Sequence, residues 1–129
     1  MSPDNSLIHL LQFGRSGQLG GELAVALAKE KDFHLTVLDR QGADFTKPQA
    51  IEKAILEAPQ LDVVVNTVAY TAVDRAEAEQ ELAHRVNVAA VEWLARACRA
   101  RGVPLVHIST DYVYDGAKSD PYLETDATG

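Results

Sequence analysis

The sequence has few cysteines and aromatic residues, no cluster of basic residues and no long apolar stretch, and each of these absences argues against one class of protein. One cysteine in 129 residues excludes a disulfide framework, and aromatic residues, at 6%, offer no stacking array for nucleic-acid bases. Twelve basic residues against 19 acidic ones give a formal net charge of −7, without a cluster of lysine and arginine. Nucleic-acid binding, which depends on such clusters, is therefore disfavoured. No apolar stretch approaches the roughly 20 residues that span a bilayer, so we expect no membrane partner.

The sequence does contain enough apolar side chains for a folded core. Hydrophobic residues make up 47% of the chain, and 129 residues fit one domain. Residues 1–5 lack the basic start and the long apolar segment of a signal peptide, so we expect a cytoplasmic protein. Cys98 falls on the apolar face of a predicted helix, where we expect a small buried hydrophobe with no chemical role.

The most informative feature is a glycine triplet, Gly14, Gly17 and Gly20. It lies between an apolar run at residues 7–13 and an alanine- and leucine-rich stretch at 18–31, which predicts a strand, a tight turn and a helix. Glycines at this spacing let the backbone turn sharply, let a pyrophosphate approach the main-chain amides and let the helix lie close to the strand. A flexible connection would also use glycines, but this position favours dinucleotide binding at the helix N-terminus.

A second predicted strand, residues 34–39, ends at an acidic residue. Asp39 is placed to accept hydrogen bonds from the hydroxyls of an adenosine ribose, and its charge would repel the additional phosphate of NADP. Arg40 would offset that repulsion, so the pair does not decide between NADH and NADPH. The alternative interpretation is an ordinary solvated strand end.

The rest of the chain continues to alternate between helices and strands. A capping box at Thr46 to Gln49 predicts a helix that ends before Pro59. Residues 62–67 and 105–109 predict two further strands, separated by a helix that ends at residues 102–104. The pattern predicts an α/β, Rossmann-like doubly wound parallel sheet with strand order 3-2-1-4 and a ligand site between the first and fourth strands. From Asp115 onward we expect loop.

No metal site is expected. Glu77, Glu79 and Glu81 are typical of a solvated helix start, which the helix dipole favours. The histidines lack the partners and spacing of metal ligands, and they are His9, His34, His84 and His107.

Three segments together resemble one family. They are GRSGQLG at 14–20, NTVAYTAVDRAE at 66–77 and STDYVYDG at 109–116, and they resemble dTDP-4-dehydrorhamnose reductase, an extended short-chain dehydrogenase/reductase. The resemblance implies an oxidoreductase of dTDP-L-rhamnose biosynthesis that reduces the keto group of a dTDP-sugar with NADPH or NADH. It also allows a homodimer contact in the acidic region.

The resemblance assigns roles to individual residues. Thr110 matches the catalytic hydroxyl, and Thr110 with Asp111 would contact the sugar substrate. The expected cofactor-binding residues are Gly14, Gly17, Gln18, Leu19, Gly20, Asp39, Arg40, Asp44, Phe45, Ala69, Tyr70, Thr71 and Ile108.

One part of the family's pattern is missing from the sequence. The family's Tyr-x-x-x-Lys helix, which supplies the proton, would begin after Gly129, and Tyr114 with Lys118 is interpreted as a turn. We therefore expect residues 1–129 to be the NAD(P)-binding portion of a reductase, without the later strands and the substrate domain, and inactive by itself. Two alternatives stay open: another nucleotide-sugar dehydrogenase or epimerase, and a non-catalytic regulatory subunit that binds a dinucleotide.

Overall fold

The computed structural model describes residues 7–129 and contains a four-stranded parallel sheet. Its strands are β1 (Ile8–Phe13), β2 (Phe33–Leu38), β3 (Val63–Asn66) and β4 (Leu105–His107). Helices alternate with the strands along the chain, which is the pattern that gives a parallel sheet. The predicted α/β, Rossmann-like class is confirmed.

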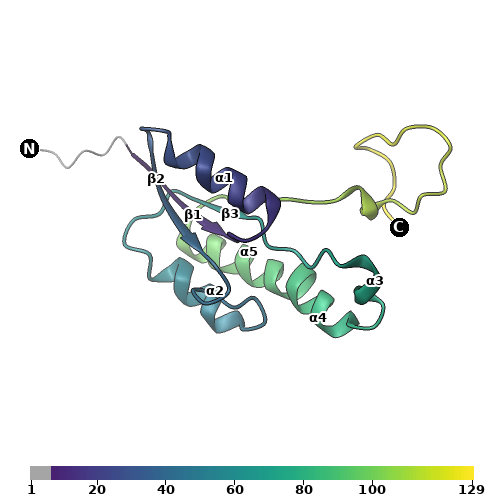
Figure 1. Ribbon diagram of the computed structural model, residues 1–129, viewed down its shortest axis with the longest axis horizontal. Coiled ribbons are helices and arrows are strands. Elements are labelled where there is room, and N and C mark those ends of the chain that lie inside the picture. The colour runs from purple at the N-terminus through teal and green to yellow at the C-terminus, as the bar shows by residue number, and fades with distance from the viewer. Residues whose placement is uncertain (1–6) are drawn as a thin grey trace, which may run out of the picture.

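The helices lie on both faces of the sheet. Figure 1 shows α1 (Gln18–Ala28) on one face, with α2 (Pro48–Leu56) and α5 (Ala90–Arg101) side by side on the other. Two short helices, α3 (Val73–Ala76) and α4 (Gln80–His84), follow β3, and α4 continues through a π-helical turn at Arg85–Ala89 into α5. Among the residues described, no helix has the length and apolar character needed to cross a bilayer.

The strand order differs from the expected one. It is β2-β1-β3-β4, so β1 lies between β2 and β3, and the predicted order 3-2-1-4 is wrong. Residues 10–13 of β1 are all buried, as in a central strand, whereas His34 and Thr36 of β2 are exposed, as in an edge strand. All four predicted strands were found, but their hydrophobic runs do not show which strands pair with one another.

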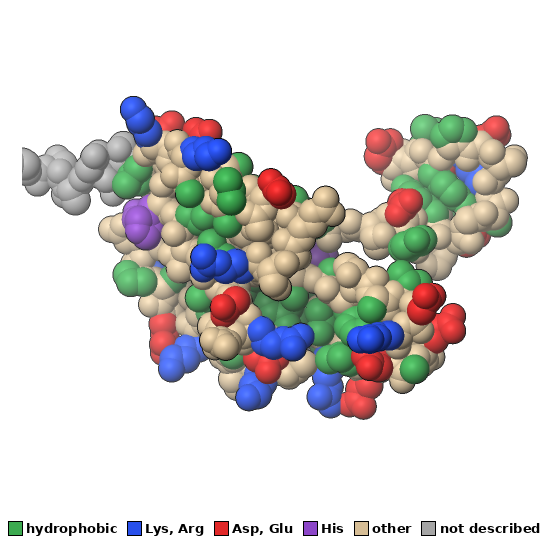
Figure 2. All heavy atoms as spheres, in the orientation of Figure 1, with side chains coloured by type: hydrophobic (Ala, Val, Ile, Leu, Met, Phe, Trp, Pro, Cys, Tyr) green, Lys and Arg blue, Asp and Glu red, His purple; other side chains and the backbone are tan. Residues whose placement is uncertain are grey.

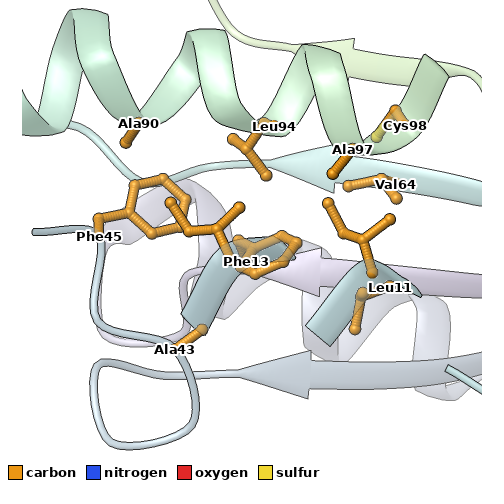
Figure 3. Close-up of a cluster of buried hydrophobic side chains, with 11 residues drawn as sticks. Leu11, Phe13, Ala43, Phe45, Val64, Ala90, Leu94, Ala97 and Cys98 are labelled. Carbon is orange, nitrogen blue, oxygen red and sulfur yellow. The ribbon is translucent and has the colours of Figure 1, made fainter. Parts of the chain in front are cut away.

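The main core fills the space between the sheet and the α2–α5 layer. Figure 3 shows side chains of α5 facing those of β1 and β3, with Phe45 packed beside Phe13 at a ring-centroid distance of 5.5 Å. Cys98 belongs to this cluster and is 2% exposed. Burial raises the pKa of its thiol to about 11, which keeps the thiol protonated and supports a packing role.

The start of α2 also departs from the prediction. Its N-cap is Lys47 without a side-chain hydrogen bond, and Pro48 occupies the first helical position. Thr46 does not cap the helix, because its hydroxyl donates to the Asp44 carboxylate at 2.7 Å. The capping box is therefore wrong, and the proline, whose backbone angle suits a first turn, starts the helix instead.

Residues 111–129 form a separate lobe that leaves the sheet after β4. Figure 1 shows this segment in yellow, and Figure 2 shows that a thin neck connects it to the body of the molecule. The Tyr114 and Tyr122 rings stack at 4.4 Å, and Lys118 Nζ lies 2.7 Å from an Asp126 carboxylate oxygen. Tyr114 and Lys118 are not on a helix, which confirms the turn interpretation of this pair.

Arg101, the last residue of α5, connects that helix to the end of α2. Its guanidinium donates to three main-chain carbonyls, at 3.1 Å to Ile55, 2.9 Å to Leu56 and 2.6 Å to Ala58. Carbonyls at a helix C-terminus have no partner within the helix, and a cation there also interacts favourably with the helix dipole. Arg101 therefore supplies the missing hydrogen bonds of α2.

Replacement of Arg101 by alanine is expected to lower the free energy of unfolding by about 1 to 3 kcal/mol, because several charge-assisted hydrogen bonds are lost. Urea unfolding followed by circular dichroism measures the change. Arg99→Ala, at an exposed position of the same helix, is the matched control and should change stability by less than about 0.5 kcal/mol. Equal effects of the two substitutions would contradict the bridging role.

Candidate functional site

The glycine triplet forms the turn between β1 and α1, and Gly14 makes the turn possible. Its φ is +101°, a conformation that side-chain-bearing residues rarely adopt. A Cβ at this position would lie 2.3 Å from the Thr67 hydroxyl oxygen, which is a steric clash. The Gly14 amide donates to the Leu38 carbonyl at 2.9 Å and so fixes the turn against the end of β2.

Gly20 and Gly17 are required for different reasons. A Cβ on Gly20 would lie 2.7 Å from the Gly14 carbonyl oxygen, so the absent side chain lets the first turn of α1 lie directly against the loop. A Cβ on Gly17 would have no neighbour within 4 Å. Gly17 therefore leaves open space beside the helix N-terminus, and an incoming group could approach the backbone there.

The N-terminus of α1 has unpaired donors. Gly17 is the N-cap, without a side-chain hydrogen bond, and the amide of Gly21 is the first to bond back, to the Gly17 carbonyl at 2.9 Å. Within residues 7–129, the amides of Gln18, Leu19 and Gly20 have no hydrogen-bond acceptor. Three free N–H groups at the positive end of a helix dipole are suited to an anion such as a phosphate.

A cleft of about 420 Å³ opens at this turn, over the carboxyl ends of β1, β2 and β3. It lies where strand order reverses, between β1 and β3, and this corrects the expected position between the first and fourth strands. Eight of the expected cofactor-binding residues line it: Gly14, Gly17, Asp39, Arg40, Asp44, Phe45, Ala69 and Tyr70.

A larger groove, of about 730 Å³, lies between α2 and the sheet strands β1 and β2. None of the expected site residues lines it. The C-terminal end of α2, with Lys53 and the C-cap residue Glu57, faces the groove, and a helix C-terminus carries the negative end of the dipole. The smaller cleft at the glycine turn is therefore the better candidate for an anionic ligand.

Two carboxylates line the cleft after β2, and each is held by nearby donors. One oxygen of Asp39 accepts from the amides of Gln41 and Gly42, both at 3.0 Å, which leaves the second oxygen available. Asp44 accepts from the amide and the hydroxyl of Thr46, and these hydrogen bonds lower the pKa of its carboxyl group. Asp44 is therefore ionised at neutral pH.

Tyr70 lies at the opposite wall, after β3, and its main chain is held by Asn87. The Tyr70 amide donates to the Asn87 side-chain oxygen at 2.8 Å, and the Asn87 side-chain nitrogen donates back to the Tyr70 carbonyl at 3.1 Å. The Tyr70 hydroxyl donates to the Glu79 carboxylate at 2.5 Å, and this hydrogen bond raises the pKa of the phenol. A raised pKa makes the phenol a weaker acid, and the hydrogen bond to Glu79 already occupies its O–H group.

The other expected residues lie outside the lining of the cleft. Gln18, Leu19 and Gly20 form the first turn of α1 behind Gly17, and Thr71 follows Tyr70 along the chain. β4 pairs with β3 so that His107 lies opposite Asn66. The exposed residues that follow it therefore continue past the same edge of the sheet, and they include Ile108, Thr110 and Asp111. The Thr110 hydroxyl accepts from the Tyr112 amide at 3.2 Å.

Sequence reasoning missed three polar residues that support the cleft. Thr67 donates to the Phe13 carbonyl at 2.8 Å, and Gln12 donates to the carbonyls of Gly14 and Gly20. Asn87 lies in the π-helical turn, a feature that frequently occurs at functional sites. A glutamine inside an otherwise apolar strand was a signal that could have identified Gln12.

The comparisons with known proteins identify the family of the chain. The sequence model of a family described as the RmlD substrate binding domain matches residues 8–129, and the chain belongs to that family. A dTDP-4-dehydrorhamnose reductase of Burkholderia thailandensis is 47% identical over 119 residues, and that of Escherichia coli is 41% identical over 126. These alignments cover 92% and 94% of this chain but 39% and 41% of the relatives. The chain thus spans about two fifths of their length.

Solved structures show the same similarity. A dTDP-4-dehydrorhamnose reductase from Clostridium acetobutylicum superimposes with a TM-score of 0.88 at 37% identity, over 95% of this chain and 43% of that one. The reductase from Bacillus anthracis, solved in complex with NADP, gives 0.87 at 30% identity, with the same two coverages of 95% and 43%. A UDP-glucose 4-epimerase from Bifidobacterium longum, at 18% identity and a TM-score of 0.78, shares the fold alone.

The paired hydrogen bonds of Asn87 lead to a prediction about the cleft wall. Asn87→Ala should accelerate amide hydrogen exchange at Tyr70 by about tenfold, because about 1.4 kcal/mol of local stability is lost with these two bonds. Exchange followed by NMR measures the rate. Gln80→Ala, at an exposed position at the start of α4, serves as the control and should leave Tyr70 unchanged. An unchanged rate in Asn87→Ala would show that another contact holds the segment.

Proposed function

We propose that this chain is the NAD(P)H-binding portion of a dTDP-4-dehydrorhamnose reductase, which reduces the keto group of a dTDP-sugar in dTDP-L-rhamnose biosynthesis. The observation that carries the proposal is the unpaired N-terminus of α1, which opens beside Gly17 into the cleft at the ends of β1 and β3. Membership of the RmlD substrate binding domain family supports it. The 129 residues would then be the N-terminal portion of one dinucleotide-binding Rossmann domain.

Different parts of the dinucleotide would bind at the two ends of the cleft. The amides of Gln18 and Leu19 would bind the pyrophosphate, with Gly14, Gly17 and Gly20 shaping the loop. The free oxygen of Asp39 would accept from the adenosine ribose, with Arg40 beside it. Asp44 and Phe45 would border the adenine, and the opposite side would receive the nicotinamide. The residues proposed for that side are Ala69 and Tyr70, which line the cleft, together with Thr71 and Ile108.

The nicotinamide cofactor, NADPH or NADH, would supply a hydride to the sugar's keto carbon. Negative charge then develops on the keto oxygen, and a hydroxyl donor stabilises such charge. Thr110 is the proposed donor, since its O–H group is oriented only by the Asp111 carboxylate at 3.4 Å and can turn to a substrate oxygen. Asp111 would contact the sugar. We also propose a cytoplasmic location, where nucleotide sugars and nicotinamide cofactors are found, and a homodimer contact through the acidic residues after β3.

Addition of a methyl group at Gly17 tests the proposed approach of the pyrophosphate. Gly17→Ala should not lower stability, since the new Cβ meets nothing within 4 Å, yet it should raise the Kd for NADPH by about tenfold or more because it fills the space over the amides. Isothermal titration calorimetry gives the Kd. Gly21→Ala, whose Cβ would make an ordinary 3.4 Å contact, is the control and should bind normally. Equal binding by both variants would exclude this mode of binding.

Two substitutions at Asp39 separate its charge from its role in the loop. Asp39→Ala should weaken NADH binding by about 1 to 3 kcal/mol, because ribose hydroxyls lose their acceptor. Asp39→Asn keeps an oxygen for the amides of Gln41 and Gly42, so the loop is preserved, and loss of the charge should shift preference towards NADPH. The Kd values for both cofactors, measured in parallel, give the result. Unchanged NADH binding in Asp39→Ala would remove Asp39 from the site.

A further inference from the structure

Gln12 is a fully buried polar residue directly beneath the glycine turn. It lies in β1, the central strand, and its exposed fraction is 0%. Its side-chain nitrogen donates to the Gly14 carbonyl at 2.8 Å and to the Gly20 carbonyl at 2.7 Å. One amide group therefore connects the start of the loop to the first turn of α1.

The hydrogen bond to the Gly14 carbonyl fixes the direction in which the next loop amide, that of Arg15, points. A trans peptide is planar, so its N–H points opposite to its C=O. Because the Gly14 carbonyl is directed towards Gln12 in the core, the N–H of Arg15 in the same peptide points away from the core. Arg15 lines the cleft, so Gln12 directs an amide towards the side from which an anion would approach.

The buried side chain of Gln12 lowers the stability of the core, so packing alone does not explain why a glutamine is present. Its side-chain oxygen is buried and has no hydrogen-bond partner among residues 7–129. A buried acceptor that loses water and gains no partner is destabilising, and an apolar side chain of similar shape would avoid that penalty. The rest of the buried segment, Leu10, Leu11 and Phe13, is apolar. The glutamine is therefore better explained by its two donated hydrogen bonds than by core stability.

We propose that Gln12 is a positioning residue for the pyrophosphate of the bound dinucleotide: it holds the Gly14 carbonyl inward, so that the Arg15 amide stays directed towards the cleft, and through the Gly20 carbonyl it ties the loop to the first turn of α1. This inference rests on the proposed function of that cleft. It assigns to Gln12 an effect on pyrophosphate binding that is separate from the stability of the fold and from binding of the adenosine end.

The test uses Gln12→Leu and Gln12→Met, which replace the side-chain amide with an apolar group of comparable size and so remove the two donated hydrogen bonds. Calorimetry measures the Kd for NADPH, and NMR titration measures the Kd for adenosine, which lacks the pyrophosphate. We expect NADPH binding to weaken by about tenfold, as two hydrogen bonds contribute, while adenosine binding and the thermal midpoint stay close to wild type. Gln49→Leu, at an exposed position of α2, is the matched control and should bind both ligands normally.

A measurement on the unsubstituted chain makes the test independent of how well the variants fold. The side-chain amide resonances of Gln12 should shift when NADPH binds and stay unchanged with adenosine. Equal NADPH binding by wild type and both variants, an equal loss of adenosine binding, or Gln12 resonances that do not respond to NADPH would each overturn the inference. Failure of the wild-type chain to bind NADPH at all would instead overturn the proposed function, and this inference with it.

Discussion

The contact on which the rest of the site depends is the close approach of α1 to the end of β1. At 2.7 Å from the Gly14 carbonyl, the position of a Cβ on Gly20 leaves no room for any side chain. This contact places the first turn of α1, with its unpaired amides, at the carboxyl edge of the central strands, directly behind the cleft residue Gly17. The positive end of the helix dipole, the free N–H groups and the open space at Gly17 all lie at one place. They do so because the backbones of α1 and the loop approach each other without side chains between them.

The helices and strands could be predicted because local patterns determine them, whereas the order of the strands could not. Continuous apolar runs identified β1 and β3, and the end of α5 at Gly102 followed from the same local reasoning. Pairing joins residues far apart in the sequence, so the hydrophobic run of one strand does not determine which strands lie beside it. The exposed polar residues of β2, His34 and Thr36, carried the only local sign that this strand lies at an edge.

Some residues of the candidate site could likewise be predicted from the sequence, and others could not. Gly14 and Gly20 could be identified because a tight turn and a close helix contact require glycine whatever surrounds them. Thr67 and Asn87 could not, because their partners, Phe13 and Tyr70, are 54 and 17 residues away along the chain. Side-chain hydrogen bonds to distant main-chain groups leave no periodicity in a sequence, so only the folded arrangement reveals them.

The two ends of the proposed site differ in how firmly they are held. The loop end is supported by buried groups of the central strand, including Gln12 and Phe13, both 0% exposed. The reacting end is formed by the exposed residues after β4, where Thr110 leads into a lobe whose stacking and ion-pair contacts are largely internal. Segments with few buried contacts open locally at low free energy, while core strands do not. The pyrophosphate would therefore bind at the rigid loop end and hold the dinucleotide in place. The exposed residues after β4 would be the ones that change conformation when a sugar binds.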